Sequence, residues 1–317
     1  MSNGSEKEVE KDIWREINEC KRAYNADDKV EATLFNIYNM KKDFYAEHAK
    51  EIETKPLPEE KLIEESFRQG KVLFPNLTFK KADISKFFHE FAREITMLND
   101  EFQEEIKNLL DTVDDYFSKK DESKEYDEYI ELDELKKLFI NDLDDEKENA
   151  LNTEAIGEIK DFYVLALTFT LSSLTELYFN NELQNLDTHL WDKGYCPVCG
   201  LHPHYGMLQE SDGKRILECW MCDVRWEFPR IACAYCHNQK QDELGYFTAD
   251  KNPLCRVHFC SKCNNYIKIF DIRKYGKRKA ILPIHHLVTL SYDLMAVREG
   301  FIPGSGLEWV NKEELKI

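Results

Sequence analysis

The sequence lacks both features that would direct a chain into or across a membrane. Its first ten residues are polar and acidic, without the apolar segment that a secretory signal requires. The most apolar stretch, Phe162–Phe179, is interrupted by Glu176 and by several Ser and Thr residues. It predicts a buried helix, because a membrane span needs ~20 largely apolar residues. We therefore expect a cytoplasmic chain with no membrane insertion, whose cysteine thiols stay reduced.

A strongly basic region is also missing. The 317 residues include 61 Asp and Glu against 43 Lys and Arg, a formal charge of −18. Residues 1–190 carry −21 of this and residues 191–317 carry +3. Because nucleic-acid affinity comes largely from clustered Lys and Arg, we expect no nucleic-acid partner. The one basic run, Arg273–Lys279, is typical of a solvated loop, with phosphate binding as the alternative.

Motifs of catalysis are absent as well. The sequence contains no phosphate-binding loop and no His-Glu-x-x-His motif. Two histidine pairs, His202/His204 and His285/His286, have no organised set of partners that would make them catalytic. Adjacent histidines on a helix would also point to different faces. We expect structural or surface roles for these residues, and a protein that is not an enzyme.

What the sequence does contain is a run of four Cys-x-x-Cys pairs. Each pair can turn two sulfurs toward one point, and two pairs complete the tetrahedron that Zn²⁺ or rubredoxin-type iron prefers. Pairing neighbours gives Cys-x2-Cys-x19-Cys-x2-Cys, typical of zinc ribbons, and then Cys-x2-Cys-x23-Cys-x2-Cys, which is slightly longer. We therefore predict two four-cysteine metal sites, with these ligands: Cys196, Cys199, Cys219 and Cys222 in the first, and Cys233, Cys236, Cys260 and Cys263 in the second.

Other uses of these cysteines fit less well. Structural disulfides need an oxidising compartment, and a redox Cys-x-x-Cys normally occurs once beside a βαβ pattern. Cys20 and Cys255 are left over and are expected to be buried or incidental thiols. The ligand type does not separate iron from zinc, since both accept four sulfurs in a tetrahedron.

The residue after each second cysteine supports a knuckle conformation. That position commonly adopts a positive φ, so that backbone N–H groups can face the sulfurs. Glycine adopts positive φ freely, and Asn, Asp and His are the other residues most enriched there. The four positions are Gly200, Asp223, His237 and Asn264.

Hydrophobic periodicity predicts helices through most of residues 1–190. One helix begins near Pro58 and ends at Gly70, and another has Asp83 as its N-cap and an aromatic stripe that includes Phe87, Phe88 and Phe91. A further helical pattern runs from Tyr129 to Phe139, within an acidic stretch at 111–148 that predicts a solvated face or a surface for a basic partner. Near the carboxy terminus, a single helix from Ile284 to Val297 is expected to end at Gly300.

Near Trp191 the helical periodicity gives way to short segments rich in Gly, Pro, Cys and aromatic residues. We therefore predict an α+β protein in three parts. An all-α helical domain covers 1–190, a first rubredoxin-like or zinc-ribbon metal module covers 191–232, and a second such module covers 233–317 and includes the carboxy-terminal helix.

Four ordered motifs in this region resemble those of the formate dehydrogenase accessory protein family, FdhE. The first is Gly194–Gly200 followed by Pro203, and the second is Cys219–Cys222 leading to Trp226 and then to Phe228–Asn238. The last two are Arg256–Lys268 and the tail Asp293–Phe301 with Pro303. The resemblance covers roughly residues 191–304, and residues 1–190 match only in helical character. His237 stands where the family more often has glycine.

The resemblance implies an assembly factor for respiratory formate dehydrogenase. Such a factor acts in the cytoplasm on the molybdenum- or tungsten-containing catalytic subunit before twin-arginine export, and performs no turnover chemistry. The implied metal is rubredoxin-like iron. Two alternatives stay open: a rubredoxin-like electron-transfer or thiol-redox protein, and a zinc-ribbon protein that binds nucleic acid. The sequence does not indicate an oligomeric state.

Overall fold

The computed structural model describes residues 15, 36, 39–41, 43–97, 103–118, 128–132, 134–135, 160–249, 254–274 and 281–304. Their contacts divide them into two compact units. One unit contains residues 40–56 and 74–181, and the other includes residues 57–73 and 182–304. Among the described residues, no helix has the length and apolar character to cross a membrane.

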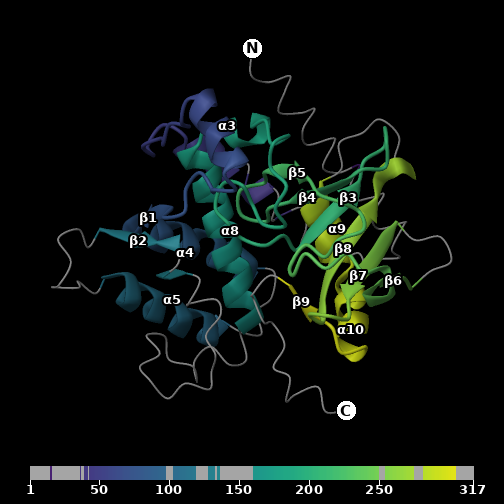
Figure 1. Cartoon of the computed structure of the whole chain (residues 1–317). Helices are drawn as coiled ribbons and strands as arrows, with labels where there is room; N and C mark the ends of the chain where they lie inside the picture. Colours follow the sequence, from purple (N-terminus) through teal and green to yellow (C-terminus); the bar gives the residue numbers. More distant parts are fainter. Residues whose placement is uncertain are drawn as a thin grey trace. The chain divides into compact units, whose positions relative to one another are not determined.

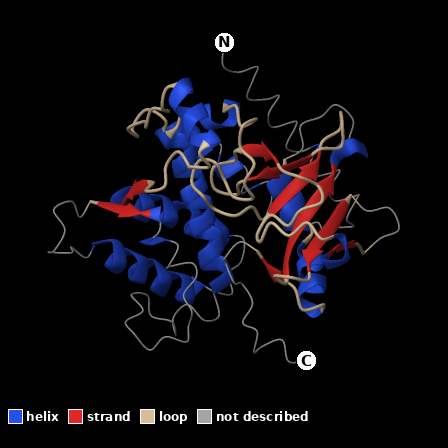
Figure 2. Cartoon of the chain, viewed as in Figure 1, coloured by secondary structure: helices blue, strands red, loops and turns tan. Residues whose placement is uncertain are grey.

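Three helices form the core of the first unit (Figures 1 and 2). They are α4 (Lys81–Met97), α5 (Gln103–Ser118) and α8 (Lys160–Tyr178), and α4 packs against both of the others. The aromatic stripe of α4 lies in this core, since Phe87, Phe88 and Phe91 are each at most 1% exposed. The ring of Phe44 meets that of Phe87 edge-on, with centroids 4.0 Å apart. The prediction that this stripe is core is confirmed.

The segment 1–190 is not all-helical, and this prediction needs correction. Strands β1 (Thr78–Lys80) and β2 (Tyr129–Glu131) form a two-stranded antiparallel sheet in which Phe79 pairs with Ile130. Both of these residues are buried, whereas Tyr129 and Glu131 are exposed. Tyr129 therefore belongs to an alternating strand rather than to the predicted helix. Leu132 and Leu135, which follow the strand, are helical and buried as predicted. The end of that helical prediction, at Leu138 and Phe139, lies outside the described residues.

Asp83 lies inside the first turn of α4 rather than at its N-cap, because the helix already begins at Lys81. Its carboxylate accepts a hydrogen bond from the Tyr178 hydroxyl (3.2 Å), which in turn accepts one from the Lys80 N–H (3.0 Å). Burial raises the pKa of Asp83 above its usual value, against the hydrogen bond from Tyr178. The side chain thus links α8 to the start of α4.

The second unit is built on a seven-stranded sheet. Six of its strands follow the order β5-β4-β3-β8-β7-β6, and the short strand β9 (Ile302–Pro303) also pairs with β8. The bounds of the six are Tyr205–Leu208 (β3), Arg215–Glu218 (β4), Arg225–Glu227 (β5), Leu244–Phe247 (β6), Cys255–Cys260 (β7) and Asn265–Asp271 (β8). Neighbours pair antiparallel within β3–β5 and within β6–β8, and β3 pairs parallel with β8. The ribbons predicted over 191–232 and 233–317 therefore share one sheet.

Close backbone packing also joins the two ribbons. A Cβ on Gly194 would lie 1.8 Å from the carbonyl oxygen of Ala234, so only glycine fits at that position. The Tyr235 hydroxyl donates to the carbonyl of Pro203 at 3.0 Å and lies 3.2 Å from that of Tyr266. The segment that opens the second ribbon is thus fixed against the first.

Helix α3 (Glu60–Arg68) belongs to this second unit. It ends as predicted at Gly70, whose φ is +67°, but Pro58 precedes its N-cap Glu59 and lies outside the first turn. Phe67 packs edge-on against Trp191, with centroids 5.4 Å apart. A backbone hydrogen bond from the Leu73 N–H to the Pro197 carbonyl (2.9 Å) attaches the following segment to the first cysteine pair.

Two helices, not one, cover a face of the sheet. They are α9 (Leu282–Val288), which contacts β3 and β8, and α10 (Leu290–Arg298), which contacts β7 and β9 (Figure 1). The single helix predicted from Ile284 to Val297 is broken at Thr289, whose hydroxyl donates to the His285 carbonyl at 2.7 Å. Such local side-chain bonds compete with the helical backbone pattern. Gly300, with a φ of +87°, follows the end of α10 as predicted.

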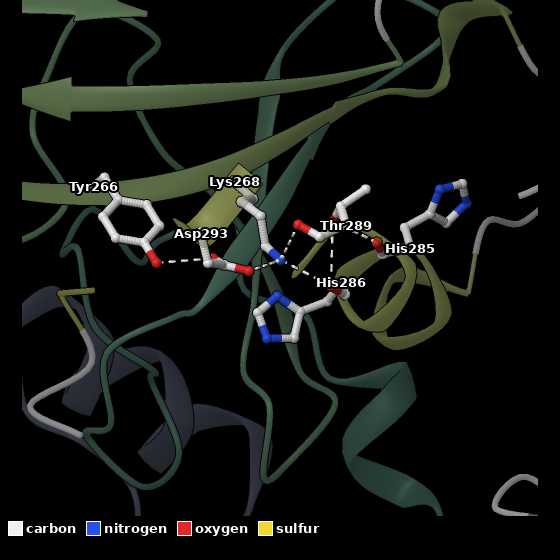
Figure 3. A network of polar contacts seen from close by, with 6 residues as sticks. All are labelled: Tyr266, Lys268, His285, His286, Thr289 and Asp293. Carbon is white, nitrogen blue, oxygen red and sulfur yellow. Dashed lines mark hydrogen bonds and ion pairs between the residues drawn. The ribbon is translucent and has the colours of Figure 1, made fainter. Parts of the chain in front are cut away.

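A buried lysine holds these helices to the sheet (Figure 3). Lys268 of β8 is fully buried, and its ammonium donates to the His286 carbonyl at 2.8 Å and to Asp293 Oδ2 at 2.6 Å. The other carboxylate oxygen of Asp293 accepts from the Tyr266 hydroxyl at 2.8 Å. A buried charge is tolerated only when it is paired and hydrogen-bonded, and both conditions are met here.

Removing the carboxylate from this network should destabilise the fold. In Asp293→Ala the ammonium of Lys268 stays buried with only carbonyl partners, so we expect the free energy of unfolding to fall by about 3 kcal/mol. Urea unfolding measures this. Asp242→Ala, which removes an exposed acid from the short 3₁₀ helix before β6, is the control and should change stability by less than about 0.5 kcal/mol. Equal effects of the two substitutions would contradict the assignment.

Candidate metal centres

The first cysteine quartet lies at one end of strands β3, β4 and β5. Cys196 and Cys199 belong to the loop before β3, and Cys219 and Cys222 to the turn between β4 and β5. All four side chains are buried, and their sulfur atoms lie within 4.8 Å of one another. The sulfurs of Cys199 and Cys219, twenty positions apart in the chain, are separated by 3.6 Å. The fold thus brings two distant cysteine pairs to one point.

The second quartet has the same construction on the other ribbon. Cys233 and Cys236 precede β6, Cys260 ends β7, and Cys263 lies in the turn to β8. These four sulfurs also lie within 4.8 Å of one another, with 3.6 Å between Cys233 and Cys263 and 3.7 Å between Cys236 and Cys260. Cys233 and Cys260 are buried, whereas Cys236 and Cys263 are only half-buried. The second quartet is therefore closer to solvent than the first.

Backbone geometry at the four knuckles confirms the predicted conformation. The φ angles of Gly200, Asp223, His237 and Asn264 are +76°, +54°, +55° and +57°. At the first three, the N–H of this residue donates to the carbonyl of the first cysteine of its pair, at 3.0 to 3.1 Å. The turn brings backbone N–H groups to the sulfurs, as shown by the 3.4 Å contact from Val198 N to Cys196 Sγ.

Sequence reasoning missed one polar side chain beside the second quartet. Asn238 is buried, and its Nδ2 lies 3.6 Å from the sulfur of Cys260 and 2.9 Å from Glu243 Oε2. Its backbone carbonyl accepts a hydrogen bond from the Cys233 N–H at 2.8 Å. Asn238 thereby contacts one ligand and orients another. Cysteine spacing carries no signal for such a residue.

Electrostatics within the first quartet oppose four free thiolates. Burial raises the pKa of Cys199 and Cys222 well above the usual value, and hydrogen bonds with neighbouring cysteines add to the effect. Burial also opposes ionisation of Cys196, but hydrogen bonds from Cys199, Cys219 and Cys222 outweigh it and lower that pKa. Four thiols at one buried point therefore need a cation if all are to ionise.

The sulfur positions fit such a cation. A tetrahedral site with Zn–S bonds of ~2.3 Å has neighbouring sulfurs about 3.8 Å apart. The three S–S separations of 3.6 to 3.7 Å agree with that edge. Both quartets could therefore hold a metal ion, and four sulfur ligands leave it no open coordination position.

Comparisons with known proteins find similarity to the FdhE proteins. The model of the FdhE central domain matches residues 195–230, which contain the whole first quartet. A protein FdhE homolog of Aquifex aeolicus (strain VF5) is 35% identical over 129 residues, or 40% of this chain and 45% of the relative. Protein FdhE of Escherichia coli (strain K12 / DH10B) is 31% identical over 114 residues, covering 35% and 36% of the two chains. Over the matched residues, this chain is similar to the FdhE proteins.

A solved structure agrees in overall fold. The crystal structure of the FdhE protein from Pseudomonas aeruginosa superposes with a TM-score of 0.53 over 93% of this chain and 94% of that one. At 17% identity, the similarity concerns the fold alone. The sequence matches to the curated FdhE proteins above span less than half of their length.

The remaining described cysteine and the histidine pairs are not members of either quartet. Cys255 is buried in β7, where burial raises its pKa to about 12, and Cys20 lies outside the described residues. The rings of His285 and His286 point apart (Figure 3): His285 packs on Phe270 and His286 on Tyr205. His204 stacks on Trp220, and burial lowers its pKa to about 3. These contacts support the predicted structural roles.

Metal analysis tests whether each quartet holds one ion. We expect two ions per chain in the wild type and one in Cys199→Ser or Cys263→Ser, because each variant breaks one quartet. Cys255→Ser should retain two ions. A chelator should empty the second site before the first, since two of its sulfurs are half-buried. Simultaneous release from both sites would contradict the difference in exposure.

The knuckle conformation predicts a specific effect at His237. Its φ of +55° disfavours β-branched side chains, so His237→Val should lower the free energy of unfolding of the metal-loaded chain by about 1–2 kcal/mol. His237→Asn should be nearly neutral, because asparagine tolerates positive φ. Denaturant unfolding measures both. Equal stability of the two variants would argue against a left-handed residue at this position.

Proposed function

We propose that this chain is a cytoplasmic assembly factor for a respiratory formate dehydrogenase. It binds the molybdenum- or tungsten-containing catalytic subunit during maturation, before twin-arginine export, and catalyses no reaction itself. The observation that carries this proposal is the pair of closed cysteine quartets in a chain that is similar to FdhE proteins. Closed, largely buried sulfur sites suit a structural role, because a catalytic metal needs an open position for substrate.

In this proposal, the metal ions stabilise the two ribbons, which bind the catalytic subunit. Each quartet connects the loop before a hairpin to the end of that hairpin, so an ion there fixes two segments at once. Structural metal sites of this kind convert metal-binding energy into folding energy. The eight cysteines named above are the ligands, and the ion is iron of the rubredoxin type, with zinc as the alternative. For the two proposed metal modules we keep the predicted limits, 191–232 and 233–317, within their shared sheet, and 1–190 for the region that precedes them.

The visible spectrum and elemental analysis of protein purified without oxygen distinguish iron from zinc. Iron in four-sulfur sites gives charge-transfer bands in the visible spectrum, and elemental analysis counts the ions. We expect coloured protein with about two iron atoms per chain. Colourless protein containing two zinc ions would assign zinc to the sites, and it would leave the assembly role standing because that role needs no redox change.

A redox role is the second candidate, and the exposure of the second quartet favours it. Cys236 and Cys263 are half-buried, so an iron ion there would lie near the surface, where electrons can be exchanged. This function requires a reversible reduction potential, whereas the assembly role does not. Voltammetry of the iron-loaded chain distinguishes the redox role from the assembly role. A potential that disappears in Cys263→Ser but persists in Cys199→Ser would assign the redox step to the second site.

Capture of the client tests the assembly role. The affinity-tagged, metal-loaded chain should retain the formate dehydrogenase catalytic subunit from a native anaerobic extract of its own organism. Cys255→Ser keeps both quartets and should retain the subunit equally well, while Cys199→Ser should retain much less because the first ribbon loses its fixed shape. Capture of ribosomes or RNA polymerase instead would favour the nucleic-acid alternative and overturn the proposal.

A further inference from the structure

The face of the large sheet opposite α9 and α10 carries a cavity of about 570 Å³. Strand pairing defines this face. Lys268 points toward α9 and α10, so its neighbour Ile267 points away from them. Ile267 pairs with His258 of β7, and His258 pairs with Tyr246 of β6. These residues lie on one side of the sheet, and the segment 230–235 borders the same cavity.

The cavity is basic in an acidic protein. Its described lining includes Arg215, Arg230 and Arg256 and contains neither Asp nor Glu. Three guanidinium groups thus border one cavity, in the part of the chain (191–317) that carries a formal charge of +3.

Two buried nitrogen atoms at this cavity have no hydrogen-bond partner within the described part of the chain. Arg215 is only 2% exposed; its Nη2 donates to the carbonyls of Pro229 and Ala232, but its Nε–H is unpaired. The Nε2 atom of His258 is also buried and unpaired. A buried donor without an acceptor is costly. A carboxylate satisfies both groups, since its oxygens accept from Arg215 and from the His258 tautomer protonated at Nε2.

Neighbouring negative groups do not remove this positive potential. Asp271 lies 3.5 Å from Arg256, but it binds Arg273 more closely, at 2.6 Å, and that second arginine balances its charge. Cys233 and Cys260 of the second quartet also line the cavity. Four thiolates around a divalent cation carry a net charge of about −2, which leaves roughly one of the three guanidinium charges unbalanced. The charge of a single carboxylate balances this one remaining positive charge.

The cavity also offers apolar contact area. Tyr246 and Ile231 line it and are each 57% exposed, and Leu244 adjoins them. β6, which carries Leu244 and Tyr246, is the last strand in the sheet order, so the cavity lies at an edge of the sheet. Specific pockets of this size combine such apolar walls with a few convergent polar groups.

We propose that this cavity binds a carboxylate-bearing ligand with an adjoining apolar group. Arg215, Arg230 and His258 hold the carboxylate, and Tyr246 and Ile231 contact the apolar part. The carboxylate belongs either to a small acid or to an acidic residue of a polypeptide. The site stands independently of the assembly role, because it rests on the cavity and its unpaired donors.

Calorimetric titration of the metal-loaded full chain tests the site with two acids and their neutral counterparts. The probes are hexanoate against hexanamide, and the capped tripeptide acetyl-leucyl-glutamyl-leucyl-amide against its glutaminyl counterpart. We expect at least one acid to bind, and its neutral counterpart to bind about tenfold more weakly, since charge-assisted hydrogen bonds to the arginines are lost. Tighter binding of the tripeptide assigns the site to polypeptides, and equal or tighter binding of hexanoate assigns it to small acids.

Two charge-matched variants localise the binding. Arg230 is exposed, so Arg230→Gln should fold normally and should weaken binding of the acid about tenfold. Arg298→Gln removes the same charge from α10, on the opposite face of the sheet, and should bind like the wild type. The proposal is overturned if neither acid binds, if acid and amide bind equally, or if both variants bind alike. Loss of the client in the capture experiment above would leave this result untouched.

Discussion

The structure of the metal-bearing unit depends on bringing four cysteine sulfurs to one point in each ribbon. Each quartet places four ionisable thiols within 4.8 Å of one another, where burial and the neighbouring sulfurs oppose the ionisation of all four. A divalent cation reverses that balance, because it stabilises all four thiolates at once. The hairpins around the sites are short, with strands of three to seven residues, and cross-links at their ends limit how far they can separate. The sheet and the sites are therefore parts of one folding unit.

Joining the two ribbons through β3 and β8 gives this unit two distinct faces. One face is closed by α9 and α10, which the buried ammonium of Lys268 attaches to the sheet. The other face contains the cavity, which is lined by three arginine side chains and lies beside the second quartet. The same strand alternation that buries Lys268 on one side presents His258 on the other. The register of β7 and β8 thus determines both which residues pack under the helices and which residues line the cavity.

Local signals in the sequence predicted the features that depend on neighbouring residues. The cysteine spacings, the residue that follows each pair and the aromatic stripe of α4 all concern a few consecutive turns of chain, and the structure agrees with each. Features that depend on distant partners were missed. Tyr129 is in a strand because β1 lies some fifty residues earlier, and the helix break at Thr289 reflects a hydroxyl bond that periodicity does not encode. The role of Asn238 and the arginine-lined cavity likewise depend on residues that are distant in sequence and come together only in the fold.

The parallel junction of β3 and β8 has a consequence for how the chain is made. Residues 205–208 leave the ribosome about sixty residues before their partner segment 265–271 does. During that interval the first ribbon can already gather its sulfurs, yet one edge of β3 has no neighbouring strand. Bare strand edges attract other chains, and long-range pairings form late. Synthesis therefore includes a period of vulnerability to aggregation, which ends only when the second ribbon emerges and docks.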